Sequence, residues 1–252
     1  MLFRSLTKAN GTIFNLHGSF VQDGGGAVSF GGSLSTSDDS ITFATEVILT
    51  QDVVLDTGSG AGDIDFTSNV QGDWLLSLDS GTGVINFLNT LGGGIPLSGL
   101  NVGSAGSLTF DGAVSADDQG IDLTAGDVTF NANVTTTGNG AVTVTNSGLL
   151  TKTDGTAFVL DGSFVQDGTG VVSFGGSLST SDALISFATE VTLTEDVVLD
   201  TGSGAGDIVF TSDVQGDYLL SLTAGTGVIS FQNALGGGIP LSGLNVGSAG
   251  SL

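Results

Sequence analysis

The chain has 252 residues, of which 39% are hydrophobic and 43 are glycine. This apolar content argues against a disordered chain, and the many glycines indicate tight turns. There are 26 acidic and 3 basic residues, for a net charge of −23. Such a charge repels phosphate backbones and anionic lipid surfaces, so it excludes nucleic acid as a partner and argues against membrane binding. Cysteine is absent, which excludes disulfides and thiol chemistry.

Short runs rich in Val, Ile, Leu, Phe and Thr recur along the chain and predict β-strands. In chain order they include DVVLD (52–56), DIDF (63–66), WLLSL (74–78), GVINF (83–87) and SLTF (107–110). Clusters such as TGSGAG and VGSAG lie between them and are typical of turns. No stretch carries a helical stripe of apolar residues, so we expect almost no helix.

The runs that end in phenylalanine repeat every 20 to 23 residues. Their last residues are Phe43, Phe66, Phe87, Phe110 and Phe130, and later Phe187, Phe210 and Phe231. Between Phe130 and Phe187 the spacing becomes irregular, through Val144, Phe158 and Phe174. A unit of this length holds about three short strands and cannot bury its own apolar face, but stacked units can. The sequence therefore predicts an all-β fold, a parallel β-solenoid or β-helix with coils of roughly 20–23 residues and a stacked phenylalanine ladder.

A longer repeat of 144 residues overlies the short one. Residues 18–108 match residues 162–252 and differ at 15 of 91 positions. Two tandem β-sandwich domains would also explain this long period. They would not explain why successive shorter units resemble each other. We therefore expect residues 1–252 to form a single continuous β-solenoid segment.

Residues 207–235, DIVFTSDVQGDYLLSLTAGTGVISFQNAL, carry a resemblance to a known family. They resemble the repeats of very large bacterial surface proteins, the filamentous-haemagglutinin-like adhesins and the related "beta strand repeat" proteins. This resemblance implies a right-handed parallel β-helix, export, and a role at the cell surface or outside the cell.

The stretch VVLDTGSGAG occurs at residues 53–62 and again at 197–206. Its Asp-Thr-Gly-Ser resembles the active-site stretch of pepsin-like aspartic proteases, which would make Asp56 and Asp200 a catalytic pair. The same slot reads LDSGTG at 78–83 and NVGSAG at 101–106, however, and it mostly lacks the aspartate. Asp56 and Asp200 would also lie several coils apart in a solenoid and could not share a proton. We therefore interpret the stretch as a turn and expect no catalytic residue.

The sequence also bears on three other kinds of chemistry. GSGAGD (58–63) lacks the lysine and the helix of a phosphate-binding loop. Asp63 and its counterpart Asp207 are weak calcium candidates, with a turn-stabilising role as the alternative. Polysaccharide lyases with a β-helix fold need a basic residue, and only Lys8 and Lys152 occupy a repeated position. The expectation is no cofactor, with calcium as the one metal left open.

The expected function is that of a structural and adhesive stalk or filament segment of an extracellular bacterial surface protein, without catalysis. Its partners would be neighbouring repeats, copies of itself end to end, or a ligand on a host or matrix surface. The alternative is a β-helix module that binds or cleaves carbohydrate. Trp74 and its counterpart Tyr218 could then provide a stacking platform.

Overall fold

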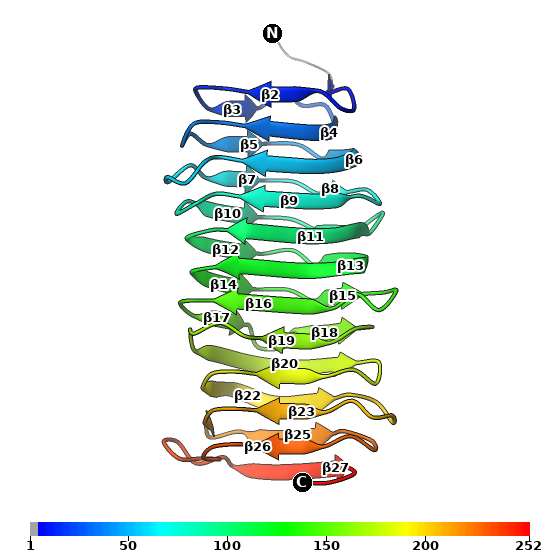
Figure 1. Ribbon diagram of the computed structural model, residues 1–252, viewed down its shortest axis with the longest axis vertical. Coiled ribbons are helices and arrows are strands. Elements are labelled where there is room, and N and C mark those ends of the chain that lie inside the picture. Colours follow the sequence, from blue (N-terminus) through cyan, green and yellow to red (C-terminus); the bar gives the residue numbers. More distant parts are fainter. Residues whose placement is uncertain (1–4) are drawn as a thin grey trace. The chain divides into compact units, whose positions relative to one another are not determined.

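The computed structural model describes residues 5–252, which form β-strands and turns and contain no helix (Figure 1). No segment of this part of the chain is therefore a helix that could cross a membrane. Contacts group the chain into two units, which meet between Gly126 and Asp127 in the sequence. Within each unit the strand pairs are parallel, as in the pairing of β5 with β7 and of β21 with β23. Each unit is thus a parallel β-solenoid, which confirms the predicted fold class.

The strands have the following bounds. In the first unit they are β1 (Leu6–Thr7), β2 (Ile13–Asn15), β3 (Phe20–Gln22), β4 (Val28–Ser35), β5 (Ile41–Phe43), β6 (Val47–Asp56), β7 (Ile64–Phe66), β8 (Val70–Gln71), β9 (Leu75–Asp79), β10 (Val84–Phe87), β11 (Leu97–Ser104), β12 (Ser107–Phe110) and β13 (Val114–Ala125). In the second unit they are β14 (Asp127–Phe130), β15 (Val134–Thr136), β16 (Val142–Asn146), β17 (Leu150–Lys152), β18 (Ala157–Leu160), β19 (Phe164–Gln166), β20 (Val172–Thr180), β21 (Ile185–Phe187), β22 (Val191–Asp200), β23 (Ile208–Phe210), β24 (Val214–Gln215), β25 (Leu219–Thr223), β26 (Ile229–Phe231) and β27 (Gly243–Ser248).

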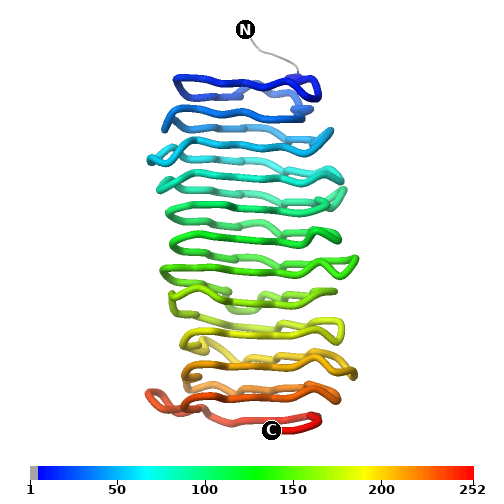
Figure 2. The backbone as a smooth tube through the Cα atoms, in the orientation of Figure 1, coloured from blue at the N-terminus to red at the C-terminus, as the bar shows by residue number. Residues whose placement is uncertain are grey.

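A coil of the first unit contains three β segments, and Figure 2 traces the backbone through successive coils. The first is short, as in β5, which pairs with β7 one coil later. The second and third belong to one long strand with a bend. In β6, the start of the strand pairs with β8 through Val47 and Val70, and its end pairs with β9 through Val53 and Leu76. Three strand segments per coil is what the sequence predicted.

A phenylalanine column runs through the interior of the first unit. Phe43, Phe66, Phe87 and Phe110 stand in register on β5, β7, β10 and β12. Their ring centroids are 5.0 to 5.4 Å apart and their planes lie within 5° of parallel. All four side chains are buried. The spacing of these residues in the sequence therefore reflects a real ladder, in which each ring removes its neighbour's apolar surface from water.

The second unit contains an equivalent column, and the residues that precede Phe187 in it account for part of the irregular spacing. Phe187, Phe210 and Phe231 stack with centroids 5.4 and 5.1 Å apart. The two preceding places in the column belong to Val144 and Gln166. Phe158 and Phe174, which the sequence suggested as members of this series, lie elsewhere. Phe158 is in register with Val134 and Leu178. Phe174 shares a column with Phe130, because Lys152 is in register with both.

Glycines form a column at one corner of the first unit. A Cβ atom on Gly83 would lie 2.2 Å from the carbonyl oxygen of Gly62, and one on Gly106 would lie 2.3 Å from that of Thr82. Gly106 also donates its N–H to the Gly83 carbonyl at 2.7 Å. The backbones of successive coils touch here, so this corner has no room for a side chain.

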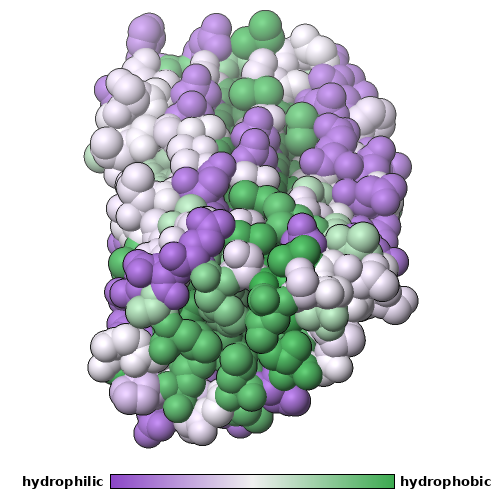
Figure 3. Space-filling model, turned by 60° about the horizontal axis from the view of Figure 1, so that its bottom comes forward, coloured by the Kyte–Doolittle hydropathy of each residue, from purple (hydrophilic) through white to green (hydrophobic). Residues whose placement is uncertain are grey.

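The last coil of the second unit leaves ladder positions uncovered. Leu244 is 40% exposed, whereas its repeat counterpart Leu100 in the first unit is 1% exposed beneath the following coil. Figure 3 shows apolar side chains gathered at this end of the second unit. The comparison shows that burial of a ladder residue depends on the coils on both of its sides.

Candidate functional site

The stretch at residues 56–62 is a corner between two strands. Gly58 donates its N–H to Asp56 Oδ1 at 2.7 Å, and the buried Thr57 donates its hydroxyl to the Gly62 carbonyl at 2.7 Å. Gly58 has a φ of 92°, a conformation that favours glycine. Asp200, Thr201 and Gly202 repeat the arrangement in the second unit, with bonds of 2.8 and 2.7 Å. The interpretation of Asp-Thr-Gly as a turn is therefore confirmed.

Each of the two aspartates has in-register neighbours within its own unit. Asp56 lies between Ser35 and Asp79, and Asp200 lies between Ser179 and Thr223. The alignment of LDTGSG with LDSGTG thus corresponds to a real register of adjacent coils. The carboxylate beside Asp56 belongs to Asp79 and not to the second copy of the motif.

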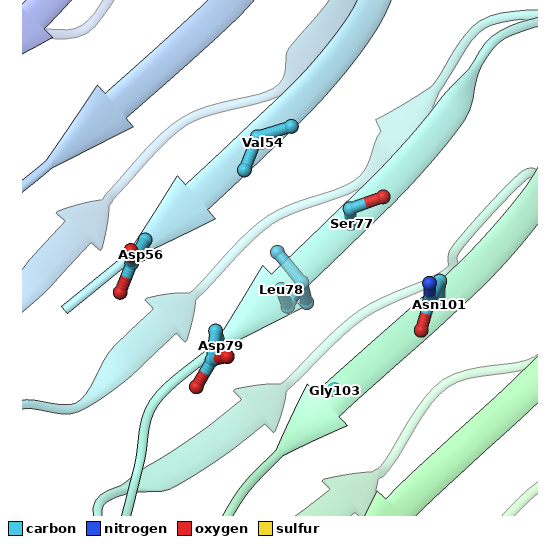
Figure 4. Close-up of a pocket in the computed structure, with 7 residues that line it drawn as sticks. All are labelled: Val54, Asp56, Ser77, Leu78, Asp79, Asn101 and Gly103. Atoms are coloured by element: carbon cyan, nitrogen blue, oxygen red, sulfur yellow. The ribbon is translucent and has the colours of Figure 1, made fainter. Parts of the chain in front are cut away.

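A hollow of about 210 Å³ lies beside this corner on the outside of the first unit (Figure 4). It is lined by β6, β9 and β11, through Val54, Asp56, Ser77, Leu78, Asp79, Asn101 and Gly103. Val54, Ser77 and Asn101 stand side by side in register. The register of β11 shifts between Val102 and Ser104, and Gly103 contributes no side chain. The hollow therefore lies where Gly103 leaves the outward-facing side of β11 without a side chain.

The polar groups of the hollow have hydrogen-bonding capacity to spare. Asp79 Oδ1 accepts bonds from the Gly81 N–H at 3.2 Å and from the Ser104 hydroxyl. Asp79 Oδ2 faces the empty position, because a Cβ on Gly103 would lie 3.4 Å from it. Within the described residues, no hydrogen bond occupies the Ser77 hydroxyl or the Asn101 amide. The hollow therefore offers carboxylate, amide and hydroxyl groups to a ligand.

Trp74 directly precedes β9, the middle strand of the hollow, and is the only tryptophan in the chain. Its side chain is 41% exposed. Tyr218, the counterpart in the second unit, is 37% exposed. An aromatic residue with a partly exposed ring thus stands at the start of the same strand in both repeats.

Neither of the two repeated lysines is on the surface. Lys152 is buried and donates from Nζ to the carbonyl oxygens of Thr156 at 2.7 Å and Gly175 at 2.5 Å. Its Nζ lies 5.2 and 5.0 Å from the ring centroids of Phe158 and Phe174. Burial lowers the pKa of Lys152 to about 8, and the charges of Glu195 and Asp154 offset part of that effect.

Lys8 is held in the same way in the first unit, by the carbonyls of Thr12 and Gly31. Burial lowers its pKa as well. The hypothesis that a lysine could serve as the base of a polysaccharide lyase requires an amine in a surface groove. Both amines instead lie inside a coil, enclosed by carbonyl groups and phenylalanine rings.

The two weak calcium candidates act as links between coils. Asp63 Oδ1 accepts the N–H of Val84 at 2.8 Å, and Asp207 Oδ1 accepts that of Val228 at 2.7 Å. No group of three or more acidic or histidine side chains suited to a metal ion occurs in residues 5–252. Both aspartates therefore accept a backbone N–H from the next coil, and calcium binding at Asp63 and Asp207 stays a prediction.

The hollow itself is not evident from the sequence, which does not single out Ser77, Asn101 or Gly103. The 23-residue separation of Asp56 and Asp79 in the recurring slot was a usable signal, because it places them on adjacent coils. The space beside Gly103 depends on a register shift in β11, and no residue pattern predicts that shift.

Comparisons with known proteins identify no relative. No family model matches the chain, and no curated protein or solved structure matches it significantly.

Proposed function

We propose that this chain is a non-catalytic structural and adhesive segment of a large repetitive surface protein, exposed outside a bacterial cell. The observation that carries the proposal is the turn at Asp56 and Asp200. The motif that most resembles a catalytic site closes a corner in both repeats, through the same two hydrogen bonds. Residues 207–235, with their resemblance to the repeats of large bacterial adhesins, support the surface location.

The way in which polar groups are used also supports a structural role. Asp52 Oδ1 accepts the Leu75 N–H at 3.1 Å, and Asp196 makes the equivalent bond to Leu219 at 2.9 Å. Asp127 Oδ1 accepts the Leu149 N–H at 2.7 Å. These carboxylates bond to backbone about one coil away and so reinforce the stack. A protein that must stay extended or resist unfolding benefits from such bonds between every pair of coils.

Repetition is the third support. Residues 18–108 and 162–252 keep the same corners and the same ladder positions while differing at 15 of 91 residues. Nearest-neighbour contacts dominate the stability of stacked repeats, so copies can be added without redesign of a global core. Surface proteins that need length benefit from this property.

Antibody labelling tests the surface location. Antibodies against the purified chain should label intact cells of the source bacterium in immunogold microscopy, and external protease should remove the label. A cytoplasmic protein serves as the control and should be labelled only after permeabilisation. Labelling of the chain only in permeabilised cells would contradict the proposal. Catalysis by the purified chain that Asp56→Ala and Asp200→Ala abolish would contradict its non-catalytic part.

A further inference from the structure

Two features at β9 are not required by a structural role. At its start stands the partly exposed ring of Trp74, and towards its end lies the hollow lined by Ser77 and Asp79. Ser77 follows Trp74 by three positions in the sequence, which corresponds to about 10 Å along a strand. A ligand a few sugar units long could therefore contact both features.

The hollow has the chemistry of a sugar-binding site. Asp79 Oδ2, the Ser77 hydroxyl and the Asn101 amide can accept and donate hydrogen bonds in a small area. Val54 is 45% exposed and adds an apolar surface to the same hollow. Sugars present hydroxyl groups at their edges and C–H groups on their ring faces, so this combination matches them. Sites for small ligands generally pair apolar surface with a few placed polar groups.

The negative charge of Asp56 and Asp79 favours neutral sugars over anionic ones. Asp56 and Asp79 stand in register on adjacent coils, about 4.8 Å apart between strands. Lys8, the only lysine or arginine of the described part of the first unit, is buried. A uronate or a sulfated glycan would meet two carboxylates and no accessible cation. Neutral sugars avoid this repulsion.

An added peptide strand fits this face less well. β9 is already paired with β6 on one side and with β11 on the other. Its backbone groups are therefore not available for strand addition, which is a common mode of peptide recognition.

We propose that the face of the first unit formed by β6, β9 and β11 binds a neutral polysaccharide. A sugar ring stacks on Trp74, and the hydroxyl groups of another sugar bind in the hollow at Asp79, Ser77 and Asn101. This inference goes beyond the structural role and does not depend on it, because a stalk would keep its function without the site.

The repeat provides a natural comparison. In the second unit Tyr218 replaces Trp74 and Thr223 replaces Asp79, while Val198, Ser221 and Asn245 retain the other side chains. The second unit therefore has a related face with a smaller aromatic ring and one carboxylate fewer. We expect it to bind the same sugars more weakly.

The single tryptophan makes the test direct. The full chain is titrated with dextran, mannan and a mixed-linkage β-glucan while tryptophan emission is recorded. At least one of these neutral polysaccharides should change the emission in a saturable way, whereas polygalacturonate and heparin should not. Gly103→Val fills the hollow from a position where a Cβ makes ordinary contacts, and it should weaken binding at least tenfold. Asp79→Thr should weaken it several-fold.

Tyr218→Ala is the matched control and should leave the Trp74 signal unchanged. Urea unfolding of each variant shows whether it remains folded. The proposal is overturned if no neutral polysaccharide changes the emission, or if an anionic one binds more tightly. It is also overturned if a folded Gly103→Val chain binds as well as the original.

Discussion

Lys152 brings a charged amine into the core of the second unit, and its titration links folding to pH. Burial lowers its pKa from 10.5 to about 8. Between these two values the unfolded chain holds the proton more tightly than the folded chain does. The free energy of unfolding should therefore rise with pH in this window, and the cost of burying the charge should be fully present below pH 8.

The measurement is a series of urea unfolding curves from pH 7.5 to pH 10 on the original chain and on Lys152→Met. The midpoint of the original chain should rise relative to that of the variant as pH increases. Effects of other titrating groups are common to both proteins and cancel in the difference. A constant difference between the two midpoints would show that the Lys152 amine is not desolvated.

Asp63 distinguishes a carboxylate that bonds to backbone from one that binds a metal. Asp63→Asn keeps an oxygen that can accept the Val84 N–H, so its stability should stay within a few tenths of a kcal/mol. Asp63→Ala removes the acceptor and should cost about 1 kcal/mol. Thermal unfolding with calcium and with a chelator, at equal ionic strength, should give the same midpoint for each protein. Calcium stabilisation that is lost in Asp63→Asn would instead identify a metal ligand.

At the scale of the structural element, the glycine corner fixes the distance between coils. Gly106→Ala would bring a methyl group within 2.3 Å of the Thr82 carbonyl, so the coils would have to separate locally. We expect a loss of about 1–3 kcal/mol in urea unfolding, as for other overpacked sites. Gly103→Ala is the control, since its nearest contact would be 3.4 Å from Asp79 Oδ2. Equal stability of the two variants would mean that the corner is less tightly packed than the structure indicates.

The elements also show how far the sequence predicts this fold. The period of the phenylalanine column was readable because Phe43, Phe66, Phe87 and Phe110 repeat one residue type at one position of the coil. The period became obscure after Phe130, where Lys152 takes the next place before Phe174. Val144 and Gln166 likewise precede Phe187 in its column, because a ladder constrains packing and register but not residue identity. Burial of Lys152 was not predictable, since lysine is rarely buried and the carbonyl groups that hold it come from two different coils.

The candidate site was less predictable than the fold for a related reason. Its residues come from three coils, so only the register of β6, β9 and β11 brings Val54, Ser77 and Asn101 together. Asp56 and Asp79 were visible as members of one recurring slot. The hollow beside them depends on the absence of a side chain at Gly103. A sequence pattern predicts where side chains lie, but it does not predict the empty space between them.

For the molecule as a whole, the dominant electrostatic fact is 26 acidic residues against 3 basic ones. Many of the carboxylates accept backbone N–H groups from an adjacent coil, as Asp38 does from Gly60 and Asp213 does from Ala234. These local bonds favour the folded state. The remaining interaction among the carboxylates is repulsive, because the folded chain holds them closer together than the unfolded chain does.

Salt should therefore stabilise this protein at low concentrations. Raising sodium chloride from 0.01 to 0.15 M shortens the screening length from about 30 Å to about 8 Å, which weakens repulsion between coils more than it weakens short hydrogen bonds. The urea midpoint at pH 7 should rise over this range. Potassium chloride should give the same increase, because screening depends on ionic strength and not on a specific site. A midpoint that falls with salt would mean that attractive charge pairs outweigh the repulsion among the aspartates, which would require the two buried lysines to contribute far more than their number suggests.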